Sequence, residues 1–102
     1  EAATDNGFYA IGVDSDQDHL APGTVLTSMV KKVDLAVFET IKALVDGNFE
    51  AGIQSFGIVD GGVGTSDFNF TKDIVPASVL EAVEDAKAKI ISGEIVVTDP
   101  SK

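Results

Sequence analysis

The sequence of 102 residues contains no cysteine, and this absence excludes three kinds of chemistry at once. Without a thiol the chain forms no disulfide, no zinc–thiolate site and no cysteine nucleophile. It also contains a single histidine, His19, and no neighbouring pattern supplies the nucleophile and orienting acid that a catalytic histidine needs. We therefore interpret His19 as a loop residue and predict no metal, no cofactor and no catalytic group.

Positive charge is scarce as well. The chain has 7 cationic residues, all of them lysine, against 17 acidic residues, and its formal net charge is -10. Nucleic acids and anionic membranes are bound by clustered Lys or Arg, so the composition argues against both partners. No apolar run approaches the ~20 residues of a transmembrane helix. No basic-then-apolar leader is present, so we expect any secretion signal of the parent protein to lie upstream.

The pattern of apolar residues predicts an α/β chain of at most one small domain. Apolar side chains repeat at helical spacing after the acidic Asp34 until Gly47, and again from Pro76 to Gly93. Runs of apolar and β-branched residues predict the strands. The predicted elements are strands at 7–13 and 24–30, a helix at 33–47, a strand at 53–58, a helix at 76–92 and a short strand at 95–97.

Three further segments complete the prediction. Residues 1–3 have the composition of the last turn of a helix whose beginning lies upstream. Residues 59–65 form a glycine-rich loop, typical of a tight turn or a domain crossover, and 68–74 is compatible with a short extended piece. The strands at 7–13 and 53–58 are apolar on both faces, which predicts that both are buried under covering layers.

The first predicted strand runs directly into the acidic turn that begins with Asp14 and Asp16. In α/β sheets, ligands bind outside the carboxyl ends of strands. A carboxylate there can accept two hydrogen bonds from a vicinal diol such as a ribose. The alternative is that Asp14 or Asp16 only caps the turn through its side chain.

The acids at alternate positions, Asp14, Asp16 and Asp18, also suggest a calcium loop. The EF-hand pattern would require glycine at its sixth position and glutamate at its twelfth, where this chain has His19 and Val25. We therefore reject this interpretation.

Two lysines, Lys31 and Lys32, follow the second predicted strand. Solvated surface lysines are the simpler interpretation. The functional interpretation is that Lys31 reaches the ligand cleft beside Asp14, with Lys32 on the opposite face because neighbouring residues of an extended segment alternate.

Four segments together resemble the BMP family of substrate-binding lipoproteins, also called PnrA-like receptors. They are YAIGVDSDQ at 9–17, TSMVKKVDLAV at 27–37, GIQSFGIVDGGVG at 52–64 and IISGEIVV at 90–97. The resemblance implies the C-terminal part of a type I periplasmic-binding-protein fold. This is a two-lobed, Rossmann-like α/β fold that closes on a ligand in the hinge cleft.

The resemblance further implies an extracytoplasmic receptor, either periplasmic or a cell-surface lipoprotein, that delivers a small molecule to an ABC permease. Purine nucleosides are the best-known ligands of the family, and some branches bind riboflavin or other small molecules. It also implies Asp14 as the acceptor of the ribose hydroxyls, with Lys31 at the lobe crossover and no catalysis. Residues 1–31 and 58–102 would lie in the second lobe and 32–57 in the first.

The amino-terminal portion of the family pattern is absent from the chain, so we expect it to need the N-terminal portion of the same receptor as a partner. Alone it should neither bind nucleoside nor persist as a compact monomer. A rival interpretation is a small α/β enzyme with Asp14 and Lys31 as an acid/base pair, although no third catalytic group is recognisable. Another is a structural or response-regulator-like domain, which would need a complete five-strand alternation.

Overall fold

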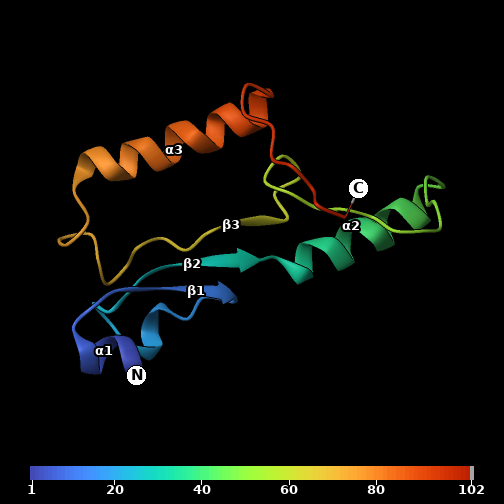
Figure 1. Cartoon of the computed structure of the whole chain (residues 1–102). Coiled ribbons are helices and arrows are strands. Elements are labelled where there is room, and N and C mark those ends of the chain that lie inside the picture. The colour runs from blue at the N-terminus through green and yellow to red at the C-terminus, as the bar shows by residue number, and fades with distance from the viewer. Residues whose placement is uncertain (102) are drawn as a thin grey trace.

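The computed structural model describes residues 1–101 as a mixed α/β chain built on one three-stranded sheet (Figure 1). Its elements in chain order are α1 (Ala2–Asn6), β1 (Ala10–Asp14), the short 3-10 helix η1 (Asp18–Leu20), β2 (Val25–Lys31), α2 (Val33–Val45), β3 (Val63–Thr65) and α3 (Ala77–Ser92). Strand β2 lies between β1, which is parallel to it, and β3, which is antiparallel to it. The predicted α/β class is confirmed.

The register of the sheet brings the carboxyl ends of β1 and β2 to the same edge. Asp14 lies opposite Val30, the penultimate residue of β2. Lys31, the last residue of β2, lies opposite Val63 at the start of β3. The acidic turn after β1 and the lysine that ends β2 are therefore neighbours at one edge of the sheet.

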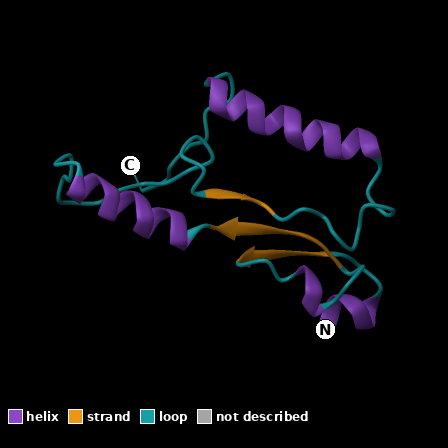
Figure 2. Cartoon of the chain, turned by 180° about the vertical axis from the view of Figure 1, so that it is seen from behind, coloured by secondary structure: helices purple, strands orange, loops and turns teal. Residues whose placement is uncertain are grey.

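Helices α1 and α3 lie on opposite sides of the strands, and α2 continues beyond the carboxyl end of β2 (Figure 2). After α2 the chain returns through residues 46–62 and enters β3 beside β2. At this return point the backbone N–H of Lys32 donates to the carbonyl of Gly62 at 2.8 Å. The outgoing and returning segments are thus joined directly at the end of the sheet.

Glycines end the helices as predicted. Gly47 and Gly93 follow α2 and α3 with φ of 77° and 85°, a conformation that glycine adopts without steric cost. The helix at the amino terminus extends beyond residues 1–3, because Gly7, with φ of 71°, ends it only after Asn6. Pro76 precedes the first turn of α3 as its N-cap instead of lying within it.

Two predicted strands are wrong. Residues 53–58 and 95–97 form no strand, and Ile53 is 98% exposed. Apolar alternation describes the side chains, whereas a strand also needs a neighbour for its backbone N–H and C=O groups. The third strand is β3, within the segment predicted as a glycine-rich loop. That loop's tight turn is present just before it, closed by the Gly62 N–H to the Gly57 carbonyl at 3.0 Å.

The segment 68–74 is a series of turns and not an extended piece. Phe68 has a φ of 55°, which is incompatible with a strand. Thr71 holds this segment on the sheet, because its buried Oγ1 donates to the carbonyl of Leu26 at 2.6 Å. The hydrogen bond aligns the segment along β2 before the chain turns into α3.

The covering layers predicted for the first strand are not supplied by the described chain itself. Ile11 and Val13 of β1 are 65% and 50% exposed, and Ala3 is the buried hydrophobic residue within 1–101. Buried side chains are otherwise polar, and neither α2 nor α3 contains a buried residue. The apolar faces of the helices and the sheet therefore remain open within the described chain.

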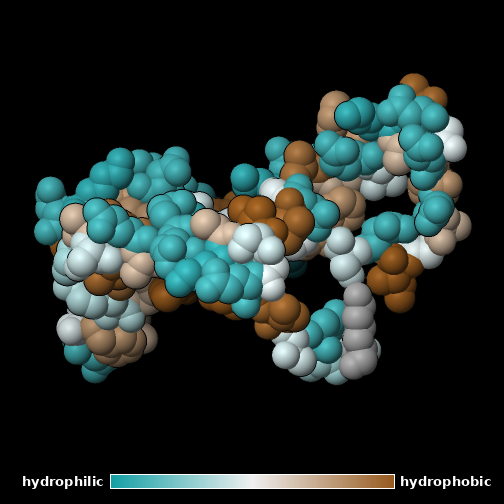
Figure 3. Space-filling model, turned by 90° about the horizontal axis from the view of Figure 1, so that it is seen from above, coloured by the Kyte–Doolittle hydropathy of each residue, from teal (hydrophilic) through white to brown (hydrophobic). Residues whose placement is uncertain are grey.

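The shape of the chain agrees with this open packing. Its radius of gyration is 16.5 Å, against about 13 Å for a compact domain of this size. Figure 3 shows an elongated molecule with hydrophobic side chains at its surface. Within residues 1–101 no helix combines the length and the apolar character needed to cross a membrane.

Candidate functional site

The structure brings Asp14 and Lys31 together at the carboxyl edge of β1 and β2. Lys31 Nζ lies 2.9 Å from Asp14 Oδ1, and the two side chains are 59% and 69% exposed, respectively. An ion pair this exposed contributes only about 0–1 kcal/mol to stability. Both charged groups are therefore accessible to a ligand that approaches the carboxyl ends of β1 and β2. Their role in binding a ligand stays a prediction.

The backbone at Asp14 is unusual. Its φ is 75°, and the N–H of Ser15 donates to the carbonyl of Val13 at 3.1 Å, which closes a three-residue turn around Asp14. A turn of this kind with a positive φ is rare and strained for a residue other than glycine. The surrounding structure must hold the turn, and such strained positions cluster at binding and active sites.

Gln17 closes the loop that follows this turn. Its Oε1 accepts the N–H of Val13 at 3.3 Å, and its own N–H donates to Ser28 Oγ at 3.0 Å. The close approach requires glycine at position 12, since a Cβ on Gly12 would lie 2.5 Å from Ser28 Oγ and 3.0 Å from Gln17 Oε1. Gly12 therefore lets the loop fold back onto β2.

A buried polar cluster anchors the far end of the same loop. Asp18 is 2% exposed, and its two oxygens accept hydrogen bonds from Ser28 Oγ at 2.6 Å and Ser66 Oγ at 2.5 Å. Ser66 Oγ also accepts the N–H of Ser28 at 2.9 Å and lies 2.9 Å from Thr27 Oγ1. The sequence analysis missed this cluster. The polar Thr27 and Ser28 inside an otherwise apolar strand were the signal that could have indicated a buried polar partner.

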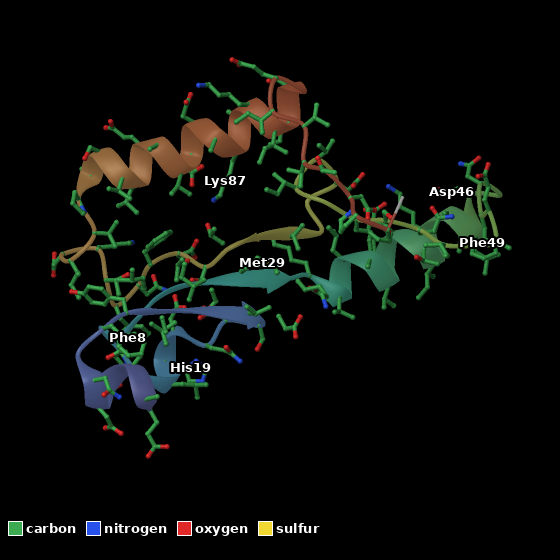
Figure 4. The ribbon with its side chains drawn as sticks, viewed as in Figure 1. Phe8, His19, Met29, Asp46, Phe49 and Lys87 are labelled. Atoms are coloured by element: carbon green, nitrogen blue, oxygen red, sulfur yellow. The ribbon has the colours of Figure 1, made fainter. Side chains whose placement is uncertain are left out.

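The remaining sequence candidates lie in different settings. Asp16 Oδ1 accepts the N–H of Asp18 at 3.0 Å, so this carboxylate makes the turn-capping bond considered as the alternative. Lys32 is exposed and, with its N–H bonded to Gly62, belongs to the return point. His19 is exposed on η1, on the α1 side of the strands (Figure 4).

The three alternating acids thus have three different environments. Asp14 is paired with Lys31, Asp16 caps a turn and Asp18 is buried between serines. Within residues 1–101, no group of three or more His, Cys, Asp or Glu side chains is arranged to hold a metal ion. The chemistry available at this edge is hydrogen bonding by an exposed carboxylate and an ammonium group.

Comparison with known proteins identifies relatives of this chain. A family model described as ABC transporter substrate-binding protein PnrA-like matches residues 1–101. Basic membrane protein B of Borreliella afzelii (strain PKo) is 39% identical over 95 residues, which cover 90% of this chain and 25% of that protein. An uncharacterized lipoprotein of Pyrococcus horikoshii is 34% identical over 95 residues, which cover 80% of this chain and 24% of that protein.

Two solved structures share the fold. A solute-binding protein of an ABC transporter system from Aeropyrum pernix K1 matches with a TM-score of 0.74 at 29% identity, covering 99% of this chain and 36% of that chain. A protein from Bacillus halodurans described as a transcriptional activator of the comK gene matches with a TM-score of 0.82 at 32% identity, covering 95% and 33%. The chain spans about a quarter of the length of these relatives and about a third of these structures. The predicted periplasmic-binding-protein-like fold is thus confirmed for the segment.

Proposed function

The chain belongs to the family of PnrA-like ABC transporter substrate-binding proteins, and we propose that it supplies part of the binding site for a purine nucleoside. The observation that carries the proposal is the exposed Asp14–Lys31 pair at the carboxyl edge of two parallel strands. Ligands of open α/β sheets bind at this edge. Another small molecule, such as riboflavin, is the alternative ligand within the same family.

The chemistry of the pair suits a ribose. An ionised carboxylate is an acceptor with two oxygens, so Asp14 can accept both hydroxyl protons of a vicinal diol. The Lys31 ammonium has three protons, of which one faces Asp14 Oδ1 and others remain for acceptors on the ligand. Asp16 is a further candidate through the oxygen that does not cap the turn.

The path of the chain supports a division between two lobes. Residues 1–31 contain β1 and β2, and residues 58–102 contain β3, which pairs with β2. Between them, residues 32–57 extend beyond the sheet (Figure 1). We assign the first and last segments to one lobe and 32–57 to the other, with the cleft between the lobes at the Asp14 edge.

The proposed receptor has an ABC permease and the N-terminal portion of the same receptor as partners. One relative is named a lipoprotein, and the family consists of substrate-binding proteins of ABC transporters, which supports a location outside the cytoplasm. Binding without catalysis is favoured because Asp14 and Lys31 pair with each other instead of with a third, orienting group. An enzyme would convert the ligand, so an unchanged nucleoside after long incubation is the expected result.

Isothermal calorimetry on the full-length protein tests the proposal. We expect a purine nucleoside to bind, and Asp14→Ala to lose more than about 1 kcal/mol of binding free energy, because hydrogen bonds to charged groups are worth about 1.5–3 kcal/mol. Glu81→Ala, which removes an exposed acid on α3, is the matched control and should bind like the wild type. A smaller loss in Asp14→Ala would count against the role of Asp14, and tight binding of riboflavin alone would select the alternative ligand.

A further inference from the structure

The carboxylate of Asp18 joins three segments that are distant in sequence. Asp18 lies at the end of the loop after β1. Its carboxylate accepts hydrogen bonds from Ser28 on β2 and from Ser66, which directly follows β3 and is 48 positions away. The side chain is 2% exposed. A charged residue is buried this completely only when its oxygens are satisfied, and here each oxygen has a hydroxyl donor.

A count of the hydroxyl protons shows that both side-chain atoms at the end of residue 18 must be hydrogen-bond acceptors. A serine hydroxyl has one proton. Ser28 Oγ uses its proton on Asp18 Oδ1 and accepts the N–H of Gln17. Ser66 Oγ uses its proton on Asp18 Oδ2 and accepts the N–H of Ser28, so it has no proton left for Thr27. The Thr27 hydroxyl is therefore the donor toward Ser66, whose Oγ lies at 2.9 Å and whose carbonyl oxygen lies at 3.4 Å.

This cluster fixes one end of the loop whose other end is the strained turn at Asp14. The near end is held by the bond between the Val13 N–H and Gln17 Oε1, and the far end by Asp18. We propose that Asp18 is a positioning residue that holds Asp14 in its positive-φ turn, so that its carboxylate is presented to the ligand. The inference rests on the proposed function, because it assigns a task to Asp18 within the same site.

Replacing Asp18 by asparagine tests the acceptor requirement with little change of volume. The new amide NH2 group would direct a donor at Ser66 Oγ or Ser28 Oγ, and both oxygens already accept backbone N–H groups. One hydroxyl proton would then lose its acceptor inside a buried site, so the cluster has to rearrange. The loop between Val13 and Asp18 would loosen, and Asp14 would lose its fixed position.

The experiment compares Asp18→Asn with Thr71→Val in the full-length protein. Thr71 is also buried and also bonds to β2, through the carbonyl of Leu26, but its hydroxyl bonds to β2 instead of to the loop. We expect Asp18→Asn to raise the Kd for adenosine or guanosine about tenfold, the ratio that corresponds to losing one hydrogen bond to a charged group. Both variants should have a lower thermal stability than the wild type, because each loses a buried hydrogen bond. In Thr71→Val, however, the Kd should stay within about twofold of the wild-type value.

Hydrogen exchange gives a second readout that needs no ligand. In Asp18→Asn the amides of Ser15 and Gln17 should exchange at least about tenfold faster, while that of Val30 in β2 stays protected. Unchanged exchange at Ser15 and Gln17 would overturn the inference even if no nucleoside binds. Failure of the proposed function looks different, because Asp14→Ala would then bind like wild type.

A double mutant separates positioning from simple loss of folded protein. If Asp18 acts through Asp14, adding Asp18→Asn to Asp14→Ala should leave the Kd of the single variant Asp14→Ala unchanged. A tenfold increase in Kd in that background would overturn the inference. So would a fall in the calorimetric binding stoichiometry of Asp18→Asn with an unchanged Kd, because that result indicates unfolding alone.

Discussion

The loop after β1 and the two long helices obtain their structure in different ways. In the loop, polar groups are buried and paired within the chain, with Asp18, Ser28 and Ser66 at the centre. In α2 and α3, apolar side chains repeat at helical spacing but none is buried. Hydrogen bonds within the chain therefore determine the shape of the candidate site, whereas the helices present apolar faces that need a covering surface.

The groove beside α3 shows what remains uncovered. It has a volume of about 440 Å3. Its walls include Met29, Val63, Val83, Ala86 and Ile90. Contiguous apolar surface of this kind promotes association in water, so the isolated chain and the full-length protein should behave differently.

The largest expected effect concerns the isolated chain. The 102-residue polypeptide should self-associate and should show no nucleoside binding, because its apolar faces are open and it supplies only one side of the cleft. Sedimentation velocity and calorimetry measure the two properties. A monodisperse, cooperatively folded monomer with the affinity of the full-length protein would contradict the account.

The next effect concerns the close packing under the loop. Gly12→Ala places a Cβ 2.5 Å from Ser28 Oγ, and overpacking of this kind costs about 1–3 kcal/mol. Gly64→Ala in β3 is the matched control, since a Cβ there meets nothing within 4 Å. Urea denaturation of the full-length protein should show a loss of unfolding free energy for Gly12→Ala alone. Equal losses in both variants would remove the special role of Gly12.

The smallest expected effect concerns the exposed ion pair. Lys31→Ala should change the unfolding free energy by less than about 1 kcal/mol, because both partners are largely exposed. Lys89→Ala on α3 breaks a comparable pair with Asp85 and serves as the control. Both variants should be stable, but only Lys31→Ala should lower the nucleoside affinity. Identical affinities would remove Lys31 from the site.

Much of the fold was predictable, because a helix depends mainly on residues that are close together in the sequence. The spacing of apolar residues and the stops at Gly47 and Gly93 locate α2 and α3 closely. Strands depend on partners elsewhere in the chain. The three residues of β3 are too few for a pattern, and 53–58 has a strand-like pattern without a neighbouring strand.

The geometry of the candidate site was predictable to a similar extent. Asp14 could be identified because it ends a strand, and Lys31 because it ends the next one. Asp18 could not, since one of its partners, Ser66, is 48 positions away, and the polar Thr27 and Ser28 indicate only that some polar group is buried beside β2. The positive φ of Asp14 also depends on bonds that only the folded loop supplies.

The most direct test of the central claim pairs a ligand change with a protein change. A purine nucleoside and its 2′-deoxy analogue are titrated by calorimetry into the full-length protein and into Asp14→Ala. If Asp14 accepts the ribose hydroxyls, the wild type should prefer the ribonucleoside by about 1.5–3 kcal/mol, and the variant should show little preference. The same preference in both proteins would contradict the claim, because another group would then recognise the ribose.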